Sequence, residues 1–181
     1  MLYITIPEQE IFDDATQTFI SVKDIKLQLE HSLVSLKKWE SKWKKPFLET
    51  KMTPEEFLSY VECMTITQNV DPAVYLLLTP ENIEEINNYI NDPMTATTFT
   101  NRDPNQGKGK KEIVTAEIIY YWMVAQQIPM ECQKWHLNQL MTLIRVCSIK
   151  NAPPKKMSKA ETMARHRAAN AKARARSRGG L

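Results

Sequence analysis

The sequence predicts a mainly α-helical protein of the α+β class, with a small N-terminal antiparallel β-meander, a helical body and a basic C-terminal arm. Apolar and polar residues alternate at the start of the chain, as in half-buried strands. After residue 30 the apolar period changes to about 3.6, which is typical of amphipathic helices. Beyond residue 150 basic residues dominate. The chain has 181 residues and 43% hydrophobic content, which suits one globular domain with an appendage.

The strands are expected within residues 2–29. Apolar residues alternate at Leu2, Ile4 and Ile6, and the same alternation recurs over residues 25–29. Residues 18–22 form a third run of β-branched and aromatic residues, which follows the turn-prone residues 13–16. We therefore predict a meander of three strands over residues 2–29.

The helical body is expected over residues 31–148, and its first helix carries two tryptophans. Leu36, Trp39 and Trp43 follow one another at helical spacing, and Pro46 ends this helix. A second helix begins at the capping box that Thr53 and Glu56 form around Pro54. Its predicted buried stripe is Phe57, Tyr60, Val61 and Met64.

Two later prolines also mark the starts of helical segments. Asp71-Pro72 is a looser form of the same device, and Thr79-Pro80 opens a helix with apolar residues at 83, 86 and 90 that Asp92-Pro93 closes. Residues 93–112 then lose all periodicity and contain Gly107 and Gly109, so we expect a mobile, solvated loop there.

Two amphipathic helices are predicted over about 115–127 and 130–148. The apolar stripe of the first is expected to be Ile118, Tyr121, Trp122 and Ala125, and that of the second His136, Leu140, Leu143 and Cys147. Ala152 and two prolines end the globular domain, which we place at residues 1–150. Residues 151–181 are expected to form an arm that is largely disordered or conditionally helical, because alanines favour helix but little apolar surface is available for docking.

The charge is unevenly distributed. Residues 150–181 hold ten basic residues and one acidic residue, so the 24 basic and 21 acidic residues of the whole chain leave 14 and 20 for residues 1–149. The arm lacks aromatic residues, so any contact with nucleic acid would be made to phosphates. Nucleic acid stays open as a partner but is not favoured. The residues expected to contact a partner are Arg165, Arg167, Lys172, Arg174, Arg176 and Arg178.

No catalytic, cofactor or metal site is expected. Cys132 and His136 would share one helix face, but a zinc site needs four ligands and the other cysteines and histidines lack ligand spacing. Nucleophile elbows, Walker loops and dinucleotide fingerprints are absent from the sequence, and Gly107-Lys108-Gly109-Lys110 lacks the ending of a phosphate loop. We therefore expect neither an enzyme nor a small-molecule substrate.

A reducing, cytoplasmic location is expected. The three cysteines are an odd number without a CxxC pair, which argues against a disulfide framework. The first residues show neither a basic n-region nor an apolar h-region, and no apolar run approaches the ~20 residues that span a bilayer.

Several segments resemble a protein found in long-tailed phages of Gram-positive hosts, the tail assembly chaperone that precedes the tape measure protein. The matching segments are EHSLVSLKKWESKW (residues 30–43), CMTITQNV (63–70), MTAT (94–97), YYWM (120–123), WHLN (135–138) and IRVCSIKNAPPKKM (144–157). The resemblance covers most of the chain and is weakest in the first hairpin, in residues 100–111 and over about the last twenty residues.

The resemblance implies a non-enzymatic helper. Such chaperones bind the long, apolar tape measure helix, keep it soluble and help tail tube protein to assemble around it, after which they leave and are absent from the mature virion. Nine methionines suit a surface that repacks around a partner helix. The alternative is a structural component of the tail or head–tail junction whose basic arm clasps a neighbour or DNA. Homo-oligomerisation stays open.

Overall fold

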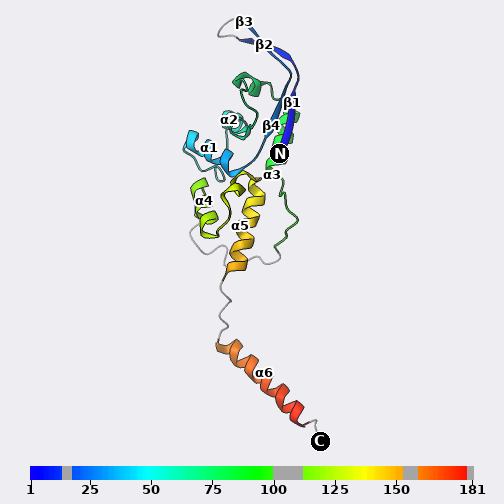
Figure 1. Ribbon diagram of the computed structural model, residues 1–181, viewed down its shortest axis with the longest axis vertical. Coiled ribbons are helices and arrows are strands. Elements are labelled where there is room, and N and C mark those ends of the chain that lie inside the picture. The colour runs from blue at the N-terminus through cyan, green and yellow to red at the C-terminus, as the bar shows by residue number, and fades with distance from the viewer. Residues whose placement is uncertain (14–17, 100–111, 153–158, 179–181) are drawn as a thin grey trace. The chain divides into compact units, whose positions relative to one another are not determined.

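A computed structural model of the chain describes residues 1–13, 18–99, 112–152 and 159–178. The predicted class is confirmed, because helices dominate the described residues and short antiparallel strands lie at the N-terminus (Figure 1). The chain falls into two compact units, Met1–Ser148 and Ile149–Leu181.

The N-terminal strands pair differently from the predicted meander. There are four described strands, β1 (Leu2–Ile6), β2 (Gln9–Asp13), β3 (Thr18–Val22) and β4 (Ile25–Leu29), and β1 pairs with β4 while β2 pairs with β3. Ile6 lies opposite Ile25 and Gln9 opposite Val22, so the two pairings keep one register. Pro7 separates β1 from β2, since proline has no N–H for the ladder. Alternation predicts strands but not their partners, which is why the meander was wrong.

One face of the β1–β4 pair is buried. Ile4, Ile6, Leu27 and Leu29 are all 2% exposed or less, whereas Tyr3 is exposed. This apolar face joins the same core as the helices, and β1 contacts helix α3 (Pro80–Asn91). The period of two in the sequence therefore reports a sheet with one buried face.

The two helices predicted around the tryptophans are present as α1 (Leu33–Trp43) and α2 (Pro54–Met64), and they pack together. The expected capping box between Thr53 and Glu56 is formed. Trp39 is fully buried, and its indole Nε1 donates to the Glu56 carbonyl at 2.9 Å, which ties α1 to the first turn of α2. The tryptophan helix is thus the centre of the core.

The next two helices begin at the prolines that the sequence analysis identified as starts. Asp71 caps the 3₁₀ helix η1 (Pro72–Leu77), and Thr79 caps α3, where Asn82 completes the capping box. Ile86 is buried, and α3 ends at Asp92 as predicted. Residues 93–99 are neither helix nor strand, and residues 100–111 of the predicted loop lie outside the described residues.

The predicted helix over 130–148 begins later than expected. Residues Met130–Lys134 form a 3₁₀ helix, η2, and the α-helix α5 spans Leu137–Asn151. Between them, His136 forms a β-bridge with Ser32, and the Leu137 N–H donates to the His31 carbonyl at 2.7 Å. Pairing with the segment after β4 therefore interrupts the helix, a long-range effect that local spacing does not reveal.

Helix α4 (Ala116–Ala125) is buried on a different side from the predicted stripe. Its buried residues are Ala116, Ile119 and Met123, whereas Tyr121 and Ala125 are exposed. The prediction was wrong because every residue of this helix except Glu117 is apolar, so its spacing does not choose the packed face. In α5 the expected stripe is confirmed in part. Leu140 is buried, and His136 is buried just before the helix, but Leu143 and Cys147 are half-buried, and Ile144 is buried instead.

The second unit contains helix α6 (Lys159–Arg178). Its sequence has no apolar stripe, so nothing in its composition requires packing against a core. Within the described ranges, none of the helices is long and apolar enough to cross a membrane.

Candidate functional site

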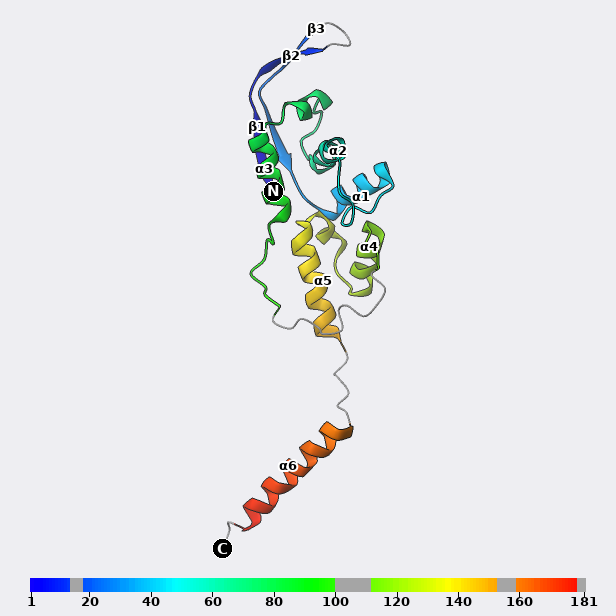
Figure 2. The same ribbon diagram turned by 180° about the vertical axis from the view of Figure 1, so that it is seen from behind.

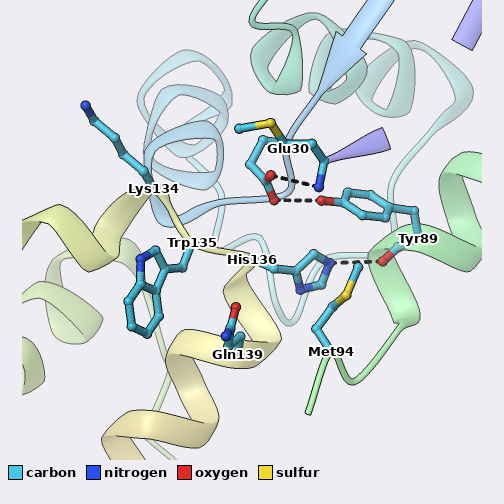
Figure 3. A pocket seen from close by; sticks show the side chains of 8 residues that line it. Glu30, Tyr89, Met94, Lys134, Trp135, His136 and Gln139 are labelled. Carbon is cyan, nitrogen blue, oxygen red and sulfur yellow. Dashed lines mark hydrogen bonds and ion pairs between the residues drawn. The ribbon is translucent and has the colours of Figure 1, made fainter. Parts of the chain in front are cut away.

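A pocket of about 340 Å³ lies where three segments of the first unit meet, at the end of β4, the end of α3 and the start of α5 (Figure 3). Figure 3 shows Glu30, Tyr89 and His136 directed toward one another, while the Lys134 side chain points away from them. The lining residues are Met1, Glu30, Tyr89, Met94, Lys134, Trp135, His136 and Gln139.

The polar groups of this pocket already have partners. The Tyr89 hydroxyl donates to Glu30 Oε1 at 2.7 Å, and the amino group of Met1 lies 3.2 Å from Glu30 Oε2. Burial and the hydrogen bond to Glu30 raise the pKa of Tyr89. The phenol therefore stays protonated and holds α3 against the segment that follows β4.

Two histidines lie beside this pair, with ring centroids 5.0 Å apart. His136 Nε2 donates to the Tyr89 carbonyl at 3.0 Å, and its Nδ1 accepts from the Asn138 N–H at 3.3 Å, so the ring is neutral. His31 Nδ1 lies 2.5 Å from the Tyr60 hydroxyl. Burial and the facing His136 lower the pKa of His31 from 6.5 to about 3, and burial lowers that of His136.

These contacts give the pocket a structural role. Each histidine and Glu30 is engaged in holding segments together, and the raised pKa of the half-buried Cys63 keeps that thiol a poor nucleophile. Cys132 lies in η2 and His136 follows it, so the two residues do not share a face of one helix as the spacing suggested. Among the described residues, no group of three or more potential ligands is placed to hold a metal ion.

A second candidate is the outer side of α4, which we call the α4 face and define as Ile118, Tyr121, Trp122, Val124 and Ala125. Tyr121 and Val124 are each 67% exposed, and Ile118 and Trp122 are half-buried. Isolated exposed apolar residues such as Leu76 are ordinary in soluble proteins. Several apolar residues exposed together on one side of a helix are instead typical of an interaction surface, and here the exposed Glu117 lies between Tyr121 and Val124 on that side.

Helix α4 is held rigidly from its inner side. Glu40 of α1 is 9% exposed, and its Oε2 accepts from the Ala116 N–H at 2.8 Å while its Oε1 accepts from the Phe47 N–H at 2.9 Å. The N-cap residue Thr115 makes no side-chain cap bond, so Glu40 satisfies a donor that the helix itself leaves open. The α4 face is therefore presented on a fixed support.

Lysines in and just after α1 contact both α2 and α4. Lys42 pairs with Glu62 of α2 at 3.2 Å, and Lys45 pairs with Glu56. On the α4 side, Lys37 lies over the Tyr120 ring, 5.2 Å from its centroid.

The six basic residues predicted to contact a partner all lie in α6. Arg165, Arg167 and Arg174 are exposed, whereas the side chains of Lys172, Arg176 and Arg178 lie outside the described residues. The prediction that they bind a partner stays a prediction. The sequence singled out Ile118, Tyr121, Trp122 and Ala125 as an apolar stripe but did not predict that this side would be exposed, although the uninterrupted apolar run over residues 118–125 signals a helix with apolar surface to spare.

Comparison of the chain with protein-family models, with curated proteins and with solved structures finds no match.

Proposed function

We propose that this protein is a non-enzymatic phage tail assembly chaperone that binds the tape measure protein in the host cytoplasm and assists assembly of the tail tube protein around it. Two things support the proposal. The segments at residues 30–43, 63–70 and 144–157 resemble that family. The α4 face offers an apolar helix with an outer side that the described chain leaves open to solvent.

The α4 face is the single observation that carries the proposal. A long apolar helix in water exposes a stripe that drives aggregation, and a chaperone must cover that stripe with apolar surface of its own. Burial of apolar area contributes roughly 25 cal/mol per Å², and an aromatic side chain such as Tyr121 brings a large part of the area. Because α4 is anchored by Glu40, little ordering entropy opposes binding.

Co-expression with the tape measure protein tests the proposal. The intact chain should keep that protein in the soluble fraction, and Tyr121→Ser combined with Val124→Ser should return it to the pellet. Leu76→Ser is the matched control, since Leu76 is 73% exposed but lies on η1. Insoluble tape measure protein in the presence of the intact chain would reject the proposal.

The exposed basic helix α6 favours one alternative, a structural component of the tail or head–tail junction that clasps a neighbour or DNA. The two functions differ in virion composition. A chaperone is absent from purified particles, whereas a connector is present in a small multiple of three or six. Quantitative mass spectrometry of purified particles therefore separates them.

A further inference from the structure

We propose that the outer edge of β1 is a contact between two copies of this chain, which pair their β1 strands antiparallel about a two-fold axis at Ile4. The sheets of the two copies then join in the strand order β4–β1–β1–β4. This inference goes beyond the proposed function and does not depend on it.

The backbone bonds of β4 show which way the backbone groups of β1 point. The Gln28 carbonyl accepts from the Ile66 N–H at 2.8 Å, and the Gln28 N–H donates to Thr67 Oγ1 at 2.9 Å. Both groups of Gln28 therefore point away from β1. Tyr3 lies opposite Gln28, so its N–H and C=O point away from β4 in turn. The same holds for Thr5, because backbone direction alternates along a strand.

These outward groups are open. Tyr3 is 51% exposed, and Thr5 is also exposed. Within the described ranges β4 is the one strand that pairs with β1, and the outward groups of Tyr3 and Thr5 have no hydrogen-bond partner there. Figure 2 shows β4 between β1 and the helices α1 and α2, so the outer edge of β1 faces away from them. Two N–H groups and two C=O groups therefore line a free sheet edge.

This edge lacks the features that keep natural edge strands from pairing. Strand β1 has the sequence LYITI, so it carries neither a charged residue nor a proline. Pro7 follows the strand directly and has no N–H, which limits any further ladder to Tyr3 and Thr5. The edge is therefore short, uncharged and ready to accept another strand.

A second copy satisfies the whole edge in one register. With the two-fold axis at Ile4, Tyr3 of each copy lies opposite Thr5 of the other, so the four N–H groups meet the four C=O groups. A shift of two residues in one direction puts Tyr3 opposite Pro7, which has no N–H. The opposite shift puts Thr5 opposite Met1, whose amine already pairs with a carboxylate. The edge is thus self-complementary, as a symmetric dimer requires.

The residues that this register brings together also match. On the buried face Ile4 lies opposite its own copy, and the half-buried Leu2 lies opposite Ile6, so apolar side chains meet. On the exposed face Tyr3 lies opposite Thr5, an aromatic and β-branched pair of the kind that stabilises antiparallel sheets. Because the ladder is far smaller than a standard interface, we expect a weak and reversible dimer.

Sedimentation velocity of the full chain, at about 10 µM to 1 mM, measures this equilibrium. The N-terminus is left untagged, because a tag would lie next to the edge. Thr5→Pro removes an N–H that β4 does not use, so it should preserve the β1–β4 ladder and remove two of the four bonds across the axis. Dimer affinity should fall roughly ten-fold or more. Thr5→Val keeps the N–H and is the matched control, which should dimerise like the original chain.

Charge provides a second variant. Tyr3→Lys with Thr5→Lys places like charges opposite each other across the axis and should abolish the dimer. Glu112→Lys changes the net charge equally at an exposed residue of another segment and should preserve it. Circular dichroism shows that each variant is folded.

Amide hydrogen exchange tests the register. The Tyr3 and Thr5 amides should exchange quickly in the dilute chain and more slowly as the dimer forms. The Ile4 amide points toward β4 and should be protected at every concentration.

Three results would overturn the inference. The first is a chain that stays monomeric up to about 1 mM. The second is a dimer that Thr5→Pro preserves and Tyr121→Ser dissociates, which would place the contact on the α4 face. The third is protection of the Tyr3 and Thr5 amides only after tape measure protein is added, which would make a strand of that protein the occupant. A tape measure protein that stays insoluble while the chain dimerises through β1 would instead reject only the proposed function.

Discussion

Helices α4 and α6 expose opposite kinds of surface. Helix α4 is apolar except for Glu117, and one side packs into the core while Tyr121 and Val124 stay in water. Helix α6 is polar and basic along its length and belongs to the other unit. The contrast teaches that the two helices would hold a partner by different forces in the proposed function. Contact through α4 would depend on buried area and be insensitive to salt, whereas contact through α6 would depend on charge and weaken as salt screens it.

The first unit, which contains α4, should respond strongly to acid. The pKa of His31 is near 3 in the folded state and 6.5 when unfolded, so the unfolded chain binds its proton first as pH falls. The contribution of His31 to the free energy of unfolding is fully present above pH 6.5. It falls by about 1.4 kcal/mol per pH unit as the pH decreases from 6.5 to 3. The lowered pKa of His136 acts in the same direction. Chemical denaturation between pH 7 and 4.5 should therefore show a loss of about 2–3 kcal/mol.

His31→Gln supplies the control for the acid prediction. The variant is less stable at pH 7 because its side chain lacks the ring that packs between Tyr60 and His136. Its pH profile should nevertheless be flatter over the same range, because the largest proton uptake has been removed. A variant profile as steep as that of the original chain would place the acid sensitivity in other groups.

Loss of a hydrogen bond between Glu40 and the backbone should cause the next largest decrease in stability. Glu40→Gln keeps one acceptor oxygen but turns an amide N–H toward one of the two backbone donors, Ala116 or Phe47. An unsatisfied buried donor costs about 1–3 kcal/mol, so urea unfolding should show a loss of about 2 kcal/mol. Glu117→Gln on the exposed side of α4 should change stability by less than about 0.5 kcal/mol. Equal losses for the two variants would mean that Glu40 does not anchor the helix.

Local signals predicted much of the fold. The capping box at Thr53 and Glu56 fixes the start of α2 because its hydrogen bonds are made within four residues. The tryptophan spacing in α1 correctly placed Trp39 in the core, since only one side of that helix is apolar. Where the pattern is one-sided and its partners are near in sequence, the sequence suffices.

Long-range pairing accounts for the failures. The strand order depends on partners up to 27 residues apart, as Leu2 with Leu29 shows, and the late start of α5 depends on the bridge from His136 to Ser32. The packed side of α4 depends on a core built from elements far away in sequence, such as α1, whose Glu40 bonds Ala116 across 76 residues. The exposed side of α4 could not be predicted for the same reason.

The smallest expected effect on stability is that of removing the arm. Deletion of residues 153–181 removes α6 but little apolar area, since the segment offers only Met157, Met163 and Leu181 as large apolar side chains. Because burial supplies most of the folding free energy, the thermal midpoint of the first unit should stay within about 1 °C.

The deletion removes Lys155, Lys156, Lys159 and the six basic residues named above against one glutamate, so the whole-chain net charge of +3 becomes −5. If α6 steers a charged partner, affinity should fall most at about 0.01 M salt, where the Debye length is about 30 Å, and little at 0.15 M, where it is about 8 Å. Binding through the α4 face should survive the deletion at both salt concentrations, and an affinity unchanged in every buffer would remove the arm from partner binding altogether.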